Sequence, residues 1–196
     1  MYEDTGGDGA VLVVLGAVLM DGSVWDPVVA NLRRDHRCVV PTLPPGAHRG
    51  PMRRDADLSL RDLGRMVTEL LARLDLREVT VVANNHGAAL ALAAEHPDQP
   101  IARLAVSSCE ALENYPPGLP GRSLRLAALM PGALLLARQA LRLRPLRRLP
   151  VTFGWMSKRP LPDELVDRWP RPAQRPRAVR RDLCAYLFGA RRGHMV

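Results

Sequence analysis

The stretch from Val79 to Ala94 constrains the fold of this chain more than any other part of the sequence. It begins with the β-branched run Val-Thr-Val-Val, passes through Ala and the polar group Asn-Asn-His-Gly, and ends in a run of alanine and leucine. β-Branched residues favour strands, whereas alanine and leucine are strong helix formers. The order predicts a buried strand, a sharp turn and a helix, as in a parallel α/β sheet.

Three further segments predict strands of the same sheet. Val11–Leu15 is a continuous apolar run, as expected for a strand buried on both faces. Shorter strands are predicted at Arg37–Val40 and Ala102–Val106, whereas residues 1–10, with three glycines, are expected to form a loop or a frayed start. Strands that alternate with helices predict an α/β fold with a doubly wound, mostly parallel sheet.

Two helices are predicted between these strands. Asp21 or Ser23 could cap a helix that ends near Arg33, with Trp25, Val28, Val29 and Leu32 turned inward. A second helix is predicted from Ser59 to about Leu74, because its apolar residues recur at three- and four-residue spacing.

The character of the chain changes near Tyr115. Prolines divide the remainder into short segments, and no alternation of strands and helices returns. We therefore expect two units, a sheet core at residues 1–115 and a small helical lobe at residues 116–196. Residues 132–143 could form a surface-seeking amphipathic helix, but we expect their leucines and alanines to pack on the core.

Charge is distributed unevenly along the 196 residues. Residues 1–119 carry 11 basic and 16 acidic side chains, whereas residues 120–196 carry 17 basic and four acidic ones. Such asymmetry can indicate an anionic partner, but an arginine-rich solvated face is the interpretation we favour. The aromatic residues of this region are not clustered with the basic runs, so no specific nucleic-acid partner is predicted.

The cysteines and the hydropathy of the sequence indicate the cellular compartment that we expect for the protein. Cys38, Cys109 and Cys184 are odd in number, far apart and without metal-like spacing, which favours free thiols in the cytoplasm. We expect no metal and no cofactor. No signal peptide is evident, and the longest apolar run, Ala10–Met20, is too short to span a bilayer.

Several segments resemble the α/β-hydrolase superfamily. In Ala-Asn-Asn-His-Gly, residues 83–87, small residues flank Asn85 as they flank the nucleophile in the elbow G-x-S-x-G, although an ordinary turn between strand and helix also fits. Gly16 stands where that fold has a His-Gly oxyanion turn, and residues 39–48 resemble its P-D-L-P-x-G loop. Residues 107–118 resemble the loop leading into a cap. The resemblance spans nearly the whole chain and implies a partial α/β-hydrolase core with a cap-like helical lobe.

Within this superfamily, the pair Asn-Asn at 84–85 looks most like the branch with an Asp nucleophile, the haloalkane dehalogenase and epoxide hydrolase relatives. Their elbow often reads Asn-Asp. In that branch a carboxylate attacks carbon to form an ester, and a histidine oriented by an acid activates the water that hydrolyses it. The resemblance therefore implies a small apolar ester, epoxide or haloalkane as substrate.

The resemblance also implies roles for particular residues. Asn85 occupies the nucleophile position, and the backbone N–H groups of Ala17 and His86 would form the oxyanion hole. Glu110, after the strand that follows the elbow, is the candidate acid, and Glu113 is a weaker second candidate. We expect Asn85 at the apex of the turn, with a positive φ angle, because asparagine tolerates that conformation.

Departures from the family pattern predict impaired catalysis. Asn85 is an amide where the nucleophile belongs, and Leu15 and Thr42 replace the usual histidine and aspartate. His194 is the only histidine after residue 115, and no strand or Asp-Gly pattern precedes it, so we do not assign it to catalysis. We expect the family's first strands and its last core strands to be absent from the sequence, which would leave Ala102–Val106 as an uncovered edge open to self-association.

Three interpretations remain open at this stage. The chain is a hydrolase relative that is truncated, degenerate or both; it is a non-catalytic protein that binds a small molecule under the lobe; or its arginine-rich lobe binds a polyanion such as nucleic acid or an acidic membrane.

Overall fold

The computed structural model describes most of the chain, namely residues 1–17, 20–44, 48, 50–84, 100–107, 118–130, 132–141, 143–152, 154, 157, 159, 161–168 and 177–189. Its strands are β1 (Tyr2–Asp4), β2 (Ala10–Leu15), β3 (His36–Pro41), β4 (Val79–Asn84) and β5 (Ile101–Ser107). Its helices are α1 (Asp26–Leu32), α2 (Leu60–Arg73), α4 (Gly118–Leu129), α5 (Ala133–Ala140), α6 (Asp163–Arg168) and α7 (Arg177–Gly189), with 3₁₀ turns η1 (Gly22–Trp25) and η2 (Arg144–Arg148).

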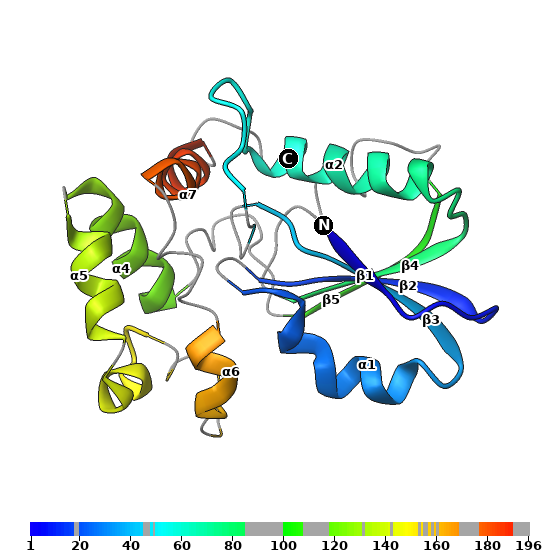
Figure 1. The fold of residues 1–196 in the computed structure, drawn as a ribbon, viewed down its shortest axis with the longest axis horizontal. Coiled ribbons are helices and arrows are strands. Elements are labelled where there is room, and N and C mark those ends of the chain that lie inside the picture. Colours follow the sequence, from blue (N-terminus) through cyan, green and yellow to red (C-terminus); the bar gives the residue numbers. More distant parts are fainter. Residues whose placement is uncertain are drawn as a thin grey trace.

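The strands form one sheet in the order β1-β3-β2-β4-β5. The pairs β2–β3, β2–β4 and β4–β5 are parallel, and β1 pairs antiparallel with β3. Helices α1 and α2 lie on opposite faces of the sheet (Figure 1). The doubly wound, mostly parallel sheet predicted from the sequence is therefore confirmed.

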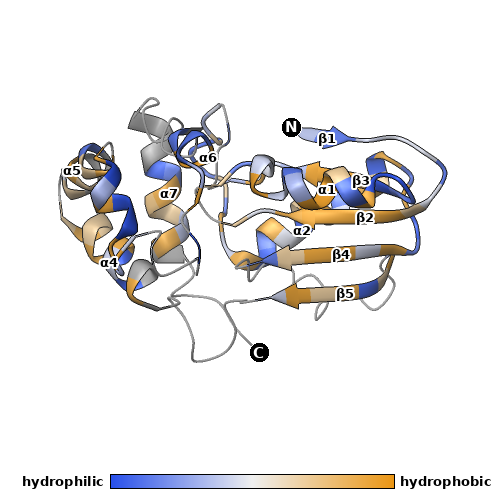
Figure 2. Ribbon diagram, turned by 90° about the horizontal axis from the view of Figure 1, so that it is seen from below, coloured by the Kyte–Doolittle hydropathy of each residue, from blue (hydrophilic) through white to orange (hydrophobic). Residues whose placement is uncertain are grey.

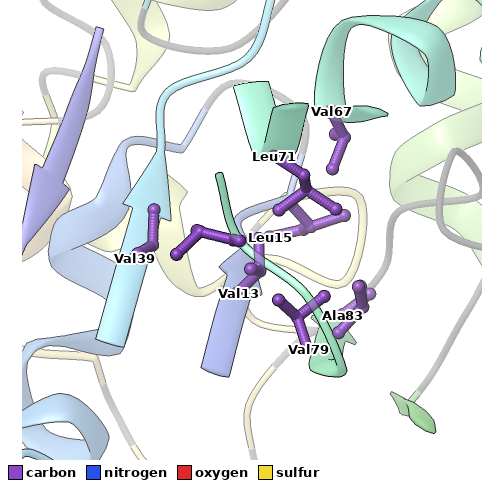
Figure 3. Packing of buried hydrophobic residues seen from close by; sticks show 9 residues of the cluster. Val13, Leu15, Val39, Val67, Leu71, Val79 and Ala83 are labelled. Atoms are coloured by element: carbon purple, nitrogen blue, oxygen red, sulfur yellow. The ribbon is translucent and has the colours of Figure 1, made fainter. Parts of the chain in front are cut away.

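The core follows from the alternation of side chains along the central strands. Val13 and Leu15 of β2 are fully buried and pack with Val67 and Leu71 of α2 (Figure 3). The intervening side chains of β2 face the other way and pack with β3, Trp25 and α1. Because both faces are covered, the strand reads as a continuous apolar run.

Strand β1 corrects the expectation that residues 1–10 form a loop or a frayed start. Tyr2–Asp4 pairs with Val39–Pro41 of β3, and Arg37 donates two hydrogen bonds to the Asp4 carboxylate, at 3.1 and 2.7 Å. All three residues of β1 are exposed, so no apolar alternation marks this strand in the sequence. Backbone pairing and one ion pair hold it in place.

The first helical region differs from its prediction in detail. Asp21 accepts a hydrogen bond from the Ser23 N–H, as expected of a cap, but the chain forms η1 before α1 begins. Trp25 and Val29 pack against the sheet, whereas Val28, predicted to face inward, is 41% exposed.

The regular elements described between residues 118 and 189 are all helices or 3₁₀ turns, as the sequence predicts. They lie beyond the carboxyl ends of β2, β4 and β5, whose arrowheads point toward them (Figure 2). Leu183, Tyr186 and Leu187 of α7 pack against the beginning of α2 and, on their other side, against α4. The expectation that the leucines of residues 132–143 pack on the core is wrong for Leu136, whose exposed fraction is 73%.

Candidate functional site

The carboxyl end of the central strand β4 is the first part of the candidate site. Ala83 is fully buried, and Asn84, the last residue of the strand, is exposed. In parallel α/β sheets, ligands bind in the crevice beyond the carboxyl ends of the strands. The predicted nucleophile position, Asn85, is the next residue along the chain, and it lies outside the described residues, as do His86 and His194.

The loop after β2 is the second part. Leu15 lies opposite Ala83 in the parallel register of β2 and β4, so both strands end at the same edge of the sheet. Ala17, the predicted oxyanion residue, follows two positions later and is 6% exposed. The structure therefore brings Ala17 to the edge where β4 delivers Asn84. The candidate acid Glu110 and its alternative Glu113 follow β5 and lie outside the described residues.

Helix α6 covers the Ala17 loop. Val166 of α6, 2% exposed, forms a buried cluster with Ala17 and Met20, and Leu161 and Leu165 pack around it. The Trp25 indole N–H donates to the Leu15 carbonyl at 3.2 Å and fixes the end of β2. Ala17 and Met20 therefore pack against apolar side chains of α6, a setting in which a hydrogen bond is electrostatically stronger.

A buried arginine holds α6 in this position. Arg147 of η2 is 8% exposed and donates to the Leu141 carbonyl at 2.7 Å. It also bonds the Asp167 carboxylate and lies 3.6 Å from a carboxylate oxygen of Asp163, both on α6. Removing these carboxylates would leave the buried charge of Arg147 uncompensated, so this contact ties the position of α6 to η2.

The structure also reveals a buried histidine–carboxylate pair that sequence reasoning missed. His48 lies in the loop after β3, and its Nε2 atom is 3.2 Å from Asp182 Oδ2 on α7. The side chains of His48 and Asp182 are 8% and 2% exposed. In the sequence, His48 is marked only by the loop resemblance of residues 39–48. The two residues of the pair are 134 positions apart, so no local pattern indicates that they meet.

Other donors complete the surroundings of Asp182. The Met52 N–H donates to Oδ2 at 2.8 Å, and Arg181 donates to Oδ1 and to the Met52 carbonyl. Burial alone would raise the pKa of Asp182, but these hydrogen bonds and that of His48 outweigh it and lower the pKa below the ordinary value. A carboxylate with so many donors is an anchor that joins α7 to the β3 loop.

The described residues do not gather three metal-ligating side chains at any point. Ala17 is the one predicted site residue that the structure describes, and its role in an oxyanion hole stays a prediction. The described part of the candidate site therefore consists of the loop that holds Ala17, the exposed end of β4 and helix α6, which packs on Ala17.

Comparisons with known proteins identify the fold. A family model described as "Alpha/beta hydrolase family" matches residues 11–194. No curated protein matches the chain significantly.

Solved structures of hydrolases match almost the whole chain. A mutant of a candidate epoxide hydrolase from Pseudomonas aeruginosa superimposes with a TM-score of 0.73 at 20% identity, over 97% of this chain and 66% of that one. The haloalkane dehalogenase DatA from Agrobacterium tumefaciens C58 gives 0.67 at 23% identity, over 97% and 62%. An esterase from Exiguobacterium antarcticum gives 0.61 at 15% identity, over 94% and 67%.

At these identities the solved structures establish the fold alone, and the chain spans about two thirds of the length of each. The family model covers nearly all of the sequence, and the parallel sheet of the structure is consistent with it. This chain belongs to the alpha/beta hydrolase family.

Proposed function

We propose that this chain is a hydrolase-fold protein whose hydrolysis of small apolar esters, epoxides or haloalkanes is impaired. The observation that carries the proposal is the end of β4. Asn84 closes the central strand at the carboxyl edge, so Asn85 is the first residue beyond it. An amide oxygen is a far weaker nucleophile than a carboxylate, so ester formation should fail at this position.

The remaining parts of the proposed site support a partial reaction only. We assign Asn85 to the nucleophile position, the N–H groups of Ala17 and His86 to the oxyanion hole, and Glu110 to the acid. Residues 116–196 contain one histidine, His194, at the end of the sequence. Without a positioned base, hydrolysis of an ester intermediate would lose about 10² to 10⁴ in rate.

A second candidate function is non-catalytic binding of a small apolar molecule. The packing of Val166 on Ala17 and Met20 supports it, because α6 then covers part of the loop after β2 whether or not a reaction follows. A third candidate is a piece of a longer hydrolase, which the coverage of 62–67% of the solved structures favours.

We further propose a division into a sheet core at residues 1–115 and a cap-like lobe at residues 116–196. A cytoplasmic location is proposed from the widely spaced cysteines, of which Cys38 is buried as a free thiol. We also propose self-association through the β5 edge, because that edge carries exposed side chains along most of its length.

A turnover assay on the unaltered chain tests whether hydrolysis is impaired. We expect no release of product above background from a panel of small esters, epoxides and haloalkanes. Multiple turnovers that are abolished by Asn85→Ala or by His194→Ala would overturn the proposal. The same assay on Asn31→Ala, an amide on the surface of α1, controls for general effects of losing an asparagine.

A further inference from the structure

The outer end of the helical segment exposes apolar side chains. Of the 12 large hydrophobic residues that are exposed in the described part of the chain, eight lie between Leu119 and Val151. Leu136 is 73% exposed, Leu143 60% and Leu126 58%. We call the exposed surface of the described residues between 118 and 151 the outer apolar surface. Helices α4 and α5 lie at the end of the molecule away from the strands in both views (Figures 1 and 2).

Helix α4 shows that this exposure is organised. Leu119, Arg122, Leu126 and Leu129 are exposed at spacings of three, four and three residues, so they share one face of the helix. Leu124 and Ala128 lie on the opposite face and pack against the cluster formed by α2 and α7. The inner face anchors α4 to the protein and leaves its outer face apolar, with an arginine at its centre.

The charge of the outer apolar surface has a single sign. Residues 118–151 contain seven arginines and no acidic residue. Arg122 and Arg148 are exposed, whereas Arg144 and Arg147 pair with acidic residues of α6. Exposed leucines beside arginines are typical of segments that lie in the interface of an anionic membrane.

The same charge argues against a second copy of this chain as the occupant. In a symmetric dimer the same patch would face itself, and its arginines would meet arginines across the interface. Duplex nucleic acid would satisfy the arginines but would leave the leucines in contact with a polar backbone. An anionic lipid surface offers phosphates to the arginines and acyl chains to the leucines.

We propose that the outer apolar surface binds peripherally to bilayers that contain anionic phospholipid. Leu126 and Leu136 enter the boundary between headgroups and acyl chains, and Arg122 and Arg148 contact the headgroup phosphates. No helix among the described residues has the length and apolarity needed to cross a bilayer. The proposed contact is a peripheral one, made through this surface.

Flotation of the full chain with vesicles tests the proposal. We expect strong binding to vesicles of phosphatidylcholine with phosphatidylserine and weak binding to phosphatidylcholine alone. Added salt should weaken the binding, because it screens the arginines, but leave a residual contribution from the leucines.

Matched variants separate the two contributions. Leu126→Ser and Leu136→Ser should each weaken binding about tenfold. Arg122→Gln and Arg148→Gln should each weaken it about fivefold on anionic vesicles and leave binding to neutral vesicles unchanged. The controls are Val28→Ser on α1, 41% exposed, and Arg73→Gln on α2, whose side chain is 80% exposed. Both should bind as the unaltered chain does.

Three results would overturn the proposal. The first is binding that the serine variants leave unchanged, because it would place the contact elsewhere. The second is equal or tighter binding to duplex DNA at physiological salt, which would indicate a nucleic-acid surface. The third is a dimer in the absence of vesicles that Leu136→Ser dissociates, which would identify a second copy as the occupant.

Discussion

Asp182 shows at the scale of one residue how this chain keeps a charge in its interior. Its side chain is 2% exposed, and desolvation of a carboxylate costs several kcal/mol. Donors from three places offset that cost: the Met52 N–H, the Arg181 guanidinium and the His48 ring. The result is a pKa below the ordinary value of 3.8 and a fixed position for α7 against the β3 loop.

Replacing this carboxylate should destabilise the protein. We expect Asp182→Asn to lower the free energy of unfolding by about 3 kcal/mol, because buried donors lose a charged acceptor. Asp55→Asn is the matched control, since Asp55 also pairs with an arginine but is 69% exposed, and it should leave stability unchanged. Urea unfolding of both variants checks the difference. Equal stability of Asp182→Asn and the unaltered chain would contradict an anchoring role.

The pH dependence of stability follows from the same shift. Because the pKa of Asp182 is lower in the folded chain than in the unfolded one, the unfolded chain binds the proton more readily in acid. The stabilisation is fully present above the ordinary pKa of 3.8 and is lost as the pH falls through the lower, folded value. The free energy of unfolding, measured at a series of acidic pH values, should therefore fall more steeply in the unaltered chain than in Asp182→Asn.

Single residues also mark the limit of prediction from sequence. The Ser59 cap could be predicted, because its partner is three residues away, and Ser59 Oγ accepts from the Asp62 N–H at 3.2 Å. In a capping box the side chain of Asp62 would in turn accept a hydrogen bond from the Ser59 N–H. Here the Ser59 N–H donates to Asp57 instead, and Asp62 pairs with Arg65. The contact between His48 and Asp182 could not be predicted, because it exists only after the whole chain has folded.

At the scale of elements, the central strands and α2 were predictable because their apolar patterns are strong. Val79–Asn84 and Ala10–Leu15 are buried strands, and the apolar face of α2 is buried as its periodicity predicts. Strand β1 was missed because it is held by backbone pairing with β3, which leaves no pattern in a three-residue sequence.

A glycine between β2 and α1 sets how closely η1 approaches the sheet. A Cβ atom at Gly22 would lie 2.8 Å from Val40 Cγ1, and Val40 is buried in β3. We expect Gly22→Ala to cost about 1–3 kcal/mol of stability through overpacking. Gly50→Ala is the control, because no atom lies within 4 Å of its Cβ position. Thermal unfolding of the two variants should separate them, and a neutral Gly22→Ala would refute the close approach.

At the scale of the whole molecule, the described sheet ends in an edge strand with little cover. Residues 102, 103 and 105–107 of β5 are exposed, and the sheet order places β5 outermost among the described strands. This edge was predictable from the sequence, because no alternation of strands and helices follows residue 115. It could not predict which parts of the core the helices cover, since that depends on α6 packing on Ala17 and α7 packing on α2.

We expect the chain to form oligomers through this edge at high concentration. Val106→Lys should shift the distribution toward monomer, because an edge charge opposes strand pairing. Val28→Lys places the same charge at a residue of similar exposure on α1 and should not. Light scattering after size exclusion checks both. A concentrated but monodisperse monomer of the unaltered chain would mean that the edge is covered.

The central claim is that a single amide, Asn85, in the position that follows β4 blocks the first step of a hydrolase reaction. Its most direct test is intact-mass spectrometry of Asn85→Asp after exposure to a reactive haloalkane. The new carboxylate should displace the halide ion and form one alkyl ester at residue 85, which we expect to persist because we assign no histidine of this chain to the activation of water. The unaltered chain and Asn84→Asp, the same change one residue earlier on β4, should gain no mass. Equal labelling of Asn84→Asp, or repeated turnover by the unaltered chain, would contradict the account.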